Sequence, residues 1–130
     1  MAKILKQKVT FKVSPDVVYE TLMDSKKHSQ MTGGKASISQ KVAGKFSAYD
    51  GYIVGTNLKL IPGKKIVQSW RGSDWPDGVY STLTFDLKKV AGGTELSMTQ
   101  VGVPIESQKS ISQGWKDYYW TPMKAMFAGK

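Results

Sequence analysis

Cysteine is absent from the 130-residue sequence, and long apolar segments are missing as well. The first absence excludes disulfides, thiolate metal sites and cysteine nucleophiles. No apolar run reaches the roughly 18 residues of a membrane span, and the start of the chain, MAKILKQK, lacks the apolar core of a secretory signal. At this length one domain is expected. We therefore expect a single cytoplasmic domain over residues 1–130 that has no membrane partner.

Histidine and arginine each occur once, as His28 and Arg71. His28 lies in DSKKHSQ, which lacks the HxxxH or HExxH spacing of a metal site, so we predict a surface or helix-end histidine. Glycine motifs that bind phosphate are missing too. The aspartates at predicted turns or caps show no sign of the burial that acid–base catalysis needs; they are Asp24, Asp50, Asp74 and Asp77. The sequence thus predicts no metal, no cofactor and no enzymatic activity.

The charge is one-sided, because the net charge is +9 and 18 of the 19 basic residues are lysines. Base-specific contacts to nucleic acids are usually made by arginine, so we expect no nucleic-acid partner. A solvated cationic surface and a surface for an acidic protein partner remain as alternatives. The candidate partner-binding residues share the outward side of the first predicted strand or follow the first predicted helix: Lys6, Lys8, Lys12, Lys26 and Lys27.

The N-terminal third of the chain alternates between strand and helix signals. Residues 5–13 alternate between apolar and polar positions, as in a half-buried strand. Ser14 and Pro15 then favour the start of a helix. Asp24 is a suitable cap for a second short helix, which Gly33-Gly34 would end.

Six further segments have the length and spacing of antiparallel strands. They are residues 35–40, 44–49, 52–61, 64–71, 79–87 and 94–103, with Asp50-Gly51 as a hairpin turn. Residues 106–127 then form a long helix. Because a meander of this kind needs one face covered, we expect an α+β fold in which a curved sheet of about seven strands surrounds the C-terminal helix.

Five of the fourteen aromatic residues fall in one C-terminal stretch, GWKDYYWTPMKAMF. On a helical wheel one stripe contains Ile111, Trp115, Tyr118, Pro122 and Met126, with Tyr119 beside it. We predict that this stripe packs on the core, that Trp120 lies off it and is exposed, and that Pro122 kinks the helix because it has no N–H to donate. A ligand wall or a partner-binding face is the alternative.

Glutamines occupy predicted inward positions on four different strands: Gln7, Gln40, Gln68 and Gln100. An unpaired amide in a dry core costs about 1–3 kcal/mol. Four such amides therefore favour a cavity that admits water between sheet and helix, unless some strands are shifted in register by one residue. The side chains predicted to line this cavity and to bind a ligand are Phe46, Gln68, Trp70, Phe85, Met98, Gln100, Trp115 and Tyr119.

Several segments together resemble one known family. They are SPDVVYETLMD, GKFSAYDGYIVG, LKLIPGKKIVQSWR, WPDG and, near the end, GVP followed by QGWKDYYWTPMK. From Leu5 to Phe127 the chain is similar to the activator of heat-shock protein 90 ATPase homologue family, and more closely to the C-terminal domain of that family, within the START-like SRPBCC superfamily. The resemblance implies the helix-grip fold of the birch pollen allergens.

The resemblance also implies a partner, since family members bind a heat-shock protein 90-type chaperone and accelerate its ATP hydrolysis without hydrolysing ATP themselves. Three functions are therefore considered. The first is a non-enzymatic binding domain that holds a small hydrophobic or amphipathic ligand in the sheet–helix cavity. The second is a co-chaperone that binds the chaperone through its surface. The third and least favoured is an enzyme on the same fold, because fold alone does not decide function.

Overall fold

The computed structural model describes residues 4–48 and 50–128. Its strands are β1 (Leu5–Phe11), β2 (Ser37–Ile38), β3 (Lys45–Ala48), β4 (Ile53–Ile61), β5 (Lys65–Gly72), β6 (Ser81–Val90) and β7 (Gly93–Val101). Its helical elements are α1 (Pro15–Met23), α2 (Ser25–Thr32), η1 (Ile105–Ser107), α3 (Gln108–Gly114), the π-helix η2 (Trp115–Trp120) and α4 (Thr121–Ala128). The predicted order of elements is confirmed, although β2 is much shorter than predicted. Tyr49, the predicted end of the third strand, lies outside the described residues.

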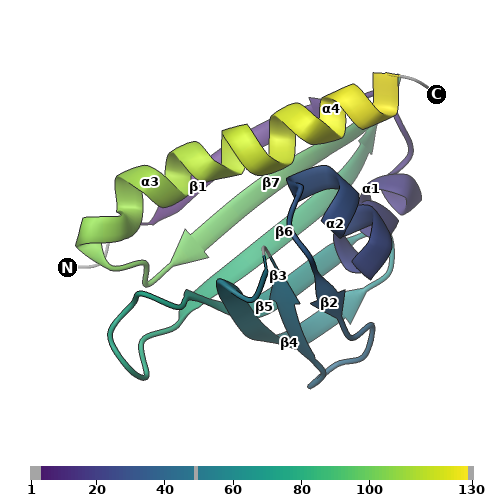
Figure 1. The fold of residues 1–130 in the computed structure, drawn as a ribbon. Helices are drawn as coiled ribbons and strands as arrows, with labels where there is room; N and C mark the ends of the chain where they lie inside the picture. The colour runs from purple at the N-terminus through teal and green to yellow at the C-terminus, as the bar shows by residue number, and fades with distance from the viewer. Residues whose placement is uncertain (1–3, 49, 129–130) are drawn as a thin grey trace.

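The seven strands form one antiparallel sheet in the order β1-β7-β6-β5-β4-β3-β2. Figure 1 shows the long C-terminal helix lying across the sheet, with α1 and α2 beside it on the same side of the sheet. Gly55 permits β4 to approach β5 closely, because a Cβ at this position would come within 1.8 Å of the Ser69 carbonyl oxygen. The α+β helix-grip architecture predicted from the sequence is therefore confirmed.

Local signals place the short helices and the hairpin between β3 and β4 as predicted. Asp24 Oδ1 accepts a hydrogen bond from the Lys27 backbone N–H at 2.9 Å, which satisfies one of the free donors at the start of α2. Gly33 ends α2 with a φ of 79°, a left-handed conformation that glycine adopts at no steric cost. Asp50 and Gly51 have φ values of 58° and 86°, as expected for a tight hairpin turn between β3 and β4.

The C-terminal helix departs from the helical wheel. Trp115 is buried as predicted, but Tyr118 is 46% exposed and Trp120 is only 6% exposed, so both of those assignments are wrong. The cause is the π-helical winding of η2, in which the Thr121 N–H donates to the Lys116 carbonyl five residues earlier. A wider turn advances the buried stripe by one residue, from Tyr118 to its neighbour Tyr119. Pro122 follows this turn directly and has no N–H to continue the α-helical pattern.

The buried side of the helix packs into an aromatic core. The helix residues in this core are Trp115, Tyr119, Trp120, Met123 and Phe127. Trp115 and Trp120 stack on each other with ring centroids 5.7 Å apart and planes inclined by 19°. Phe85 and Trp115 form a T-shaped pair with ring centroids 5.6 Å apart. Large aromatic side chains bury more apolar area than any others, so this cluster makes the main hydrophobic contact between the sheet and the helix.

Candidate functional site

The inward-facing glutamines are paired with protein groups. The Trp115 indole N–H donates to Gln100 Oε1 at 2.9 Å, and Gln100 Nε2 donates to Ser81 Oγ at 3.0 Å. The Ser81 hydroxyl in turn donates to the Trp70 carbonyl at 2.8 Å. Gln100 is fully buried, and this chain of hydrogen bonds satisfies its amide without water.

Gln7 makes the equivalent connection between β1 and the helix. Its Oε1 accepts from the Trp120 indole N–H at 2.6 Å, and its Nε2 donates to the Ser112 carbonyl at 2.8 Å and to Ser112 Oγ at 3.0 Å. Two stacked indoles of one helical segment are therefore held by two glutamines from neighbouring strands.

Gln68 points inward as predicted, and its Nε2 donates to Asn57 Oδ1 at 2.9 Å. Asn57 is fully buried, and its Nδ2 donates to the carbonyls of Ser39 and Lys41 at 2.6 and 3.1 Å. This pair links β4 and β5 to the connection between β2 and β3. The buried glutamines thus form hydrogen bonds that connect elements within the core. Their presence does not require a cavity that contains water.

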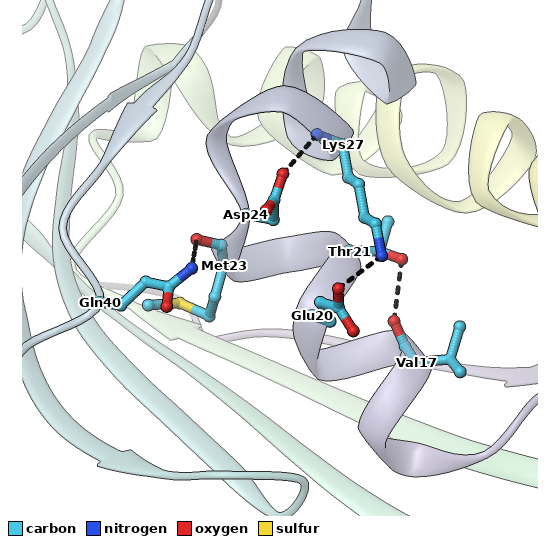
Figure 2. Close-up of polar contacts among 7 residues, drawn as sticks. All are labelled: Val17, Glu20, Thr21, Met23, Asp24, Lys27 and Gln40. Carbon is cyan, nitrogen blue, oxygen red and sulfur yellow. Dashed lines mark hydrogen bonds and ion pairs between the residues drawn. The ribbon is translucent and has the colours of Figure 1, made fainter.

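The inward position predicted for Gln40 is wrong. Gln40 is exposed, because β2 ends at Ile38 and the strand alternation stops two residues before it. Figure 2 shows its amide reaching the end of α1, where Nε2 donates to the Met23 carbonyl at 3.4 Å.

The surface position predicted for His28 is also wrong, since the side chain is 6% exposed. His28 Nδ1 lies 3.0 Å from the Leu22 carbonyl, and Nε2 lies 2.9 Å from the Tyr119 hydroxyl. A carbonyl only accepts, so Nδ1 bears the proton and Nε2 accepts from Tyr119. Burial lowers the pKa of His28, although the hydrogen bond to Leu22 opposes this shift. Burial likewise raises the pKa of the Tyr119 hydroxyl.

The enclosed part of the interface between the sheet and the helix contains little space. The hollow enclosed by these layers has a volume of about 10 Å³, close to the minimum that holds one water molecule. Six of the eight predicted ligand-binding residues line it: Phe46, Gln68, Trp70, Phe85, Trp115 and Tyr119. Met98 and Gln100 are buried at 1% and 0% exposure and line neither this hollow nor the cleft beside it. The aromatic rings thus fill most of the space in this enclosed hollow.

A half-open cleft of about 200 Å³ lies next to this filled interior. Its walls come from the end of α2, the start of β4, the end of β5 and the segment from α3 to η2: Thr32, Tyr52, Ile53, Trp70, Ser110, Ile111, Gly114, Trp115, Tyr118 and Tyr119. Three of the predicted ligand-binding residues belong to it, namely Trp70, Trp115 and Tyr119. Ile111 and Tyr118 belong to the helix stripe for which a ligand wall was the alternative, whereas the pattern did not indicate Thr32, Tyr52, Ile53, Ser110 and Gly114.

The hydroxyl groups of Thr32, Tyr52 and Tyr119 around the cleft form hydrogen bonds within the protein. The Tyr52 hydroxyl donates to Asp74 Oδ1 at 2.7 Å. The pKa of Tyr52 is raised to about 12, mainly by burial and further by the hydrogen bond to Asp74 and the negative charge of Asp74. The Tyr52 hydroxyl therefore stays protonated. Thr32 Oγ1 donates to carbonyls of its own turn, and the Tyr119 hydroxyl faces His28. The cleft therefore presents mainly aromatic and aliphatic walls.

The predicted partner-binding lysines lie on different sides of the molecule. Lys6 and Lys8 project from β1 on the face of the sheet that is remote from the helix, which we call the outer face, and Lys12 follows β1. Lys26 and Lys27 belong to α2, on the helical side of the sheet. Figure 2 shows Lys27 turning back to Glu20. Lys27 Nζ lies 2.6 Å from Glu20 Oε1. These five residues do not form one surface.

Among the described residues, no group of three or more histidine, aspartate or glutamate side chains is arranged to hold a metal ion. Nor does that part of the chain contain a helix long and apolar enough to cross a membrane.

Known proteins resemble this chain over most of its length. It is 33% identical over 120 residues, 92% of the chain, to the human activator of 90 kDa heat shock protein ATPase homolog 1. It is 38% identical over 118 residues, 88% of the chain, to the activator homolog of Dictyostelium discoideum. The match covers 36% of the human protein and 30% of the Dictyostelium protein, so the chain spans about a third of the length of these relatives.

Solved structures show the same fold. The crystal structure of an HSP90 activator from Plasmodium falciparum superposes with a TM-score of 0.92 at 24% identity, covering 96% of both chains. The solution structure of the Aha1 dimer from Colwellia psychrerythraea superposes with a TM-score of 0.84 at 18% identity, covering 98% of both chains. The model of the family described as activator of Hsp90 ATPase homolog 1-like protein matches residues 12–128. The chain therefore belongs to the family of Hsp90 ATPase activator homologues.

Proposed function

We propose that this protein is a non-enzymatic co-chaperone that binds an Hsp90-type chaperone through its surface and stimulates its ATPase. The observation that carries the proposal is the similarity to named activators of this ATPase along 92% of the chain. The chain spans about a third of those relatives, so both the binding and the stimulation of the ATPase are part of the proposal.

The packing of the domain supports binding through the surface. The interior hollow holds about 10 Å³, whereas ligand pockets usually enclose roughly 300–1,000 Å³. The net charge of +9 would draw the domain to an acidic partner and accelerate the encounter.

Surface plasmon resonance with a purified Hsp90-type chaperone tests the proposal. The association rate should fall several-fold between low and physiological salt, because exposed charges are screened beyond a Debye length of about 8–10 Å. Chaperone ATPase activity should rise when the domain is added at saturating concentration. No detectable binding at low salt, where the attraction is strongest, would reject the proposal.

A second candidate function rests on the cleft of about 200 Å³ beside Trp115. Its volume is below the usual range of drug-sized pockets, so it suits a small flat apolar molecule. Native mass spectrometry of protein purified from its own host would show whether such a molecule is retained.

A variant that fills the cleft tests this candidate directly. Gly114 lines the cleft in helical conformation, and a Cβ placed there lies 3.8 Å from the Tyr118 side chain, an ordinary contact distance, so Gly114→Leu would place its side chain at the cleft. Indole, used as a probe in titrations followed by NMR, should shift cleft resonances in the original protein and not in Gly114→Leu. Gln113→Leu is the matched control, because Gln113 is an exposed neighbour on the same helix. Equal binding of indole to both variants would exclude the cleft.

A further inference from the structure

The outer face of the sheet concentrates positive charge. Strand register and burial place seven cations and two carboxylates on it, a net charge of +5: Lys6, Lys8, Lys45, Lys59, Lys65, Arg71, Lys88, Asp86 and Glu95. The other described residues have ten lysines and eight carboxylates, a net charge of +2. Only two of the nine outer-face groups are acidic, and both already face lysines, in the pairs Lys8–Glu95 and Lys65–Asp86. Most of the excess charge therefore belongs to one face.

Exposed apolar side chains lie at one end of this face and on the segment that follows its last strand. They are Ile4 (48% exposed), Tyr80 (51%), Val101 (42%) and Ile105 (72%), which we call the end patch. Ile4 precedes Leu5, which lies opposite Gln100, and Val101 follows Gln100 and lies opposite Thr82. The end patch thus lies where β1 and β6 begin and β7 ends, next to the start of α3 (Figure 1).

The fold holds the end patch and the cationic face together. The Arg71 guanidinium lies over the Tyr80 ring, 5.7 Å from its centroid. Arg71 Nη2 also donates to the carbonyls of Trp75 and Pro76 at 2.6 and 3.3 Å, which fixes the connection between β5 and β6. Ile105 and Leu5 line a second open hollow of about 420 Å³ against α3, next to the patch. The patch therefore includes an aromatic ring that contacts a cation of the outer face, and an apolar side chain that lines a recess.

We propose that the end patch and the adjoining cationic outer face form the docking surface for an acidic region of the chaperone, in which apolar side chains insert at the patch. This inference rests on the proposed function and names the surface that performs it. Charge complementarity selects the occupant, since a second copy of the chain would bring another charge of +9 to a face that already bears +5. In protein–protein interfaces, the side chains that contribute most to the binding energy usually lie in an apolar centre that is surrounded by polar and charged side chains.

Two pairs of substitutions separate the roles of charge and patch. Lys6→Glu with Lys88→Glu reverses two outer-face charges that have no ion-pair partner among the described residues. The control, Lys116→Glu with Lys124→Glu, reverses two exposed charges on the helix.

Val101→Thr with Ile105→Ser removes apolar surface from the patch. Val42→Thr with Leu58→Ser, at positions 57% and 49% exposed elsewhere, is its control. Thermal unfolding of each variant verifies that the fold is retained.

The kinetics with immobilised chaperone should differ between the pairs. Outer-face charge reversal should slow association about fivefold or more at low salt with little change in dissociation. The patch variant should accelerate dissociation about tenfold or more with little change in association. Both controls should behave as the original protein.

Other outcomes overturn the inference in distinguishable ways. If the chaperone binds but controls and test variants behave alike, the docking surface is elsewhere and the proposed function stands. If the original protein does not bind at low salt, both proposals fail. Binding of vesicles containing anionic phosphatidylserine that is lost in the same variants, without chaperone binding, assigns the surface to lipid. A dimer that the patch substitutions dissociate assigns it to a second copy.

Discussion

The two faces of the sheet come from the same strands, yet they have opposite properties. On β7, for example, Leu96, Met98 and Gln100 are buried against the helix, whereas Glu95, Ser97 and Thr99 face outward. The inner side chains are fixed by aromatic contacts and by amide–indole hydrogen bonds. The outer ones are mostly hydroxyl-bearing and charged side chains on a solvated surface. The difference indicates that inner substitutions should change stability and outer ones should change association.

The largest effect on stability is expected at Trp115. Trp115→Ala removes a 2% exposed side chain that stacks on Trp120 and bonds to Gln100, so we expect a loss of about 3–5 kcal/mol in the free energy of unfolding. The matched outer-face substitution Thr84→Ala should stay within about 0.5 kcal/mol. Urea denaturation measures both values. A loss below about 1 kcal/mol for Trp115→Ala would contradict the assignment of this helix face to the core.

A smaller effect is expected when an inner amide is replaced. Gln100→Leu leaves the Trp115 indole N–H and the Ser81 hydroxyl without this partner, and we expect a cost of about 1–3 kcal/mol. By the same argument Gln68→Leu should destabilise, because Asn57 Oδ1 would lose its donor. Gln40→Leu is the control, since Gln40 is exposed. Equal stability of Gln100→Leu and the original protein would mean that the buried amide contributes nothing.

The buried histidine should make stability depend on pH. Burial lowers the pKa of folded His28, so the unfolded chain, with a pKa near 6.5, binds the proton first as the pH falls. This contribution to stability is complete above about pH 6.5 and is lost below it, with a slope of at most about 1.4 kcal/mol per pH unit. The difference between the original protein and His28→Gln, measured by urea denaturation from pH 7 to pH 5, isolates this group from the carboxylates that both share. A difference that is independent of pH would show that His28 is protonated equally in both states.

Strand alternation, caps and turns identified the fold because they are local. Asp24, Gly33 and Asp50-Gly51 each determine their own few residues, and burial every second residue marks the inner face of β1, β5 and β7. The helical wheel failed from Tyr118 to Trp120 because it assumes α-helical winding throughout. No residue type in the sequence specifies a π-turn, although Pro122 marks where the α-helical pattern is interrupted.

The candidate site was harder to predict because it depends on contacts between distant segments. His28 looked like a surface residue among polar neighbours, and its burial comes from Tyr119, 91 positions later. Three of the four glutamines, Gln7, Gln68 and Gln100, correctly indicated polar groups on the inner face. Their partners, such as Trp115 for Gln100, could not be known before the helix was docked. The end patch likewise gathers residues from four elements or their flanks, and each of them alone is an unremarkable exposed apolar side chain.

The central claim is that the inner face maintains the fold while the outer face and the end patch bind the chaperone. The most direct test measures unfolding free energy and chaperone association rate together for Gln100→Leu and for Lys6→Glu with Lys88→Glu. We predict that the first variant loses about 1–3 kcal/mol of stability with an unchanged association rate, and that the second keeps its stability within about 0.5 kcal/mol and associates at least about fivefold more slowly. A charge-reversed variant that associates at the original rate, or a Gln100→Leu variant that remains folded yet associates as slowly as the charge-reversed one, would contradict the account.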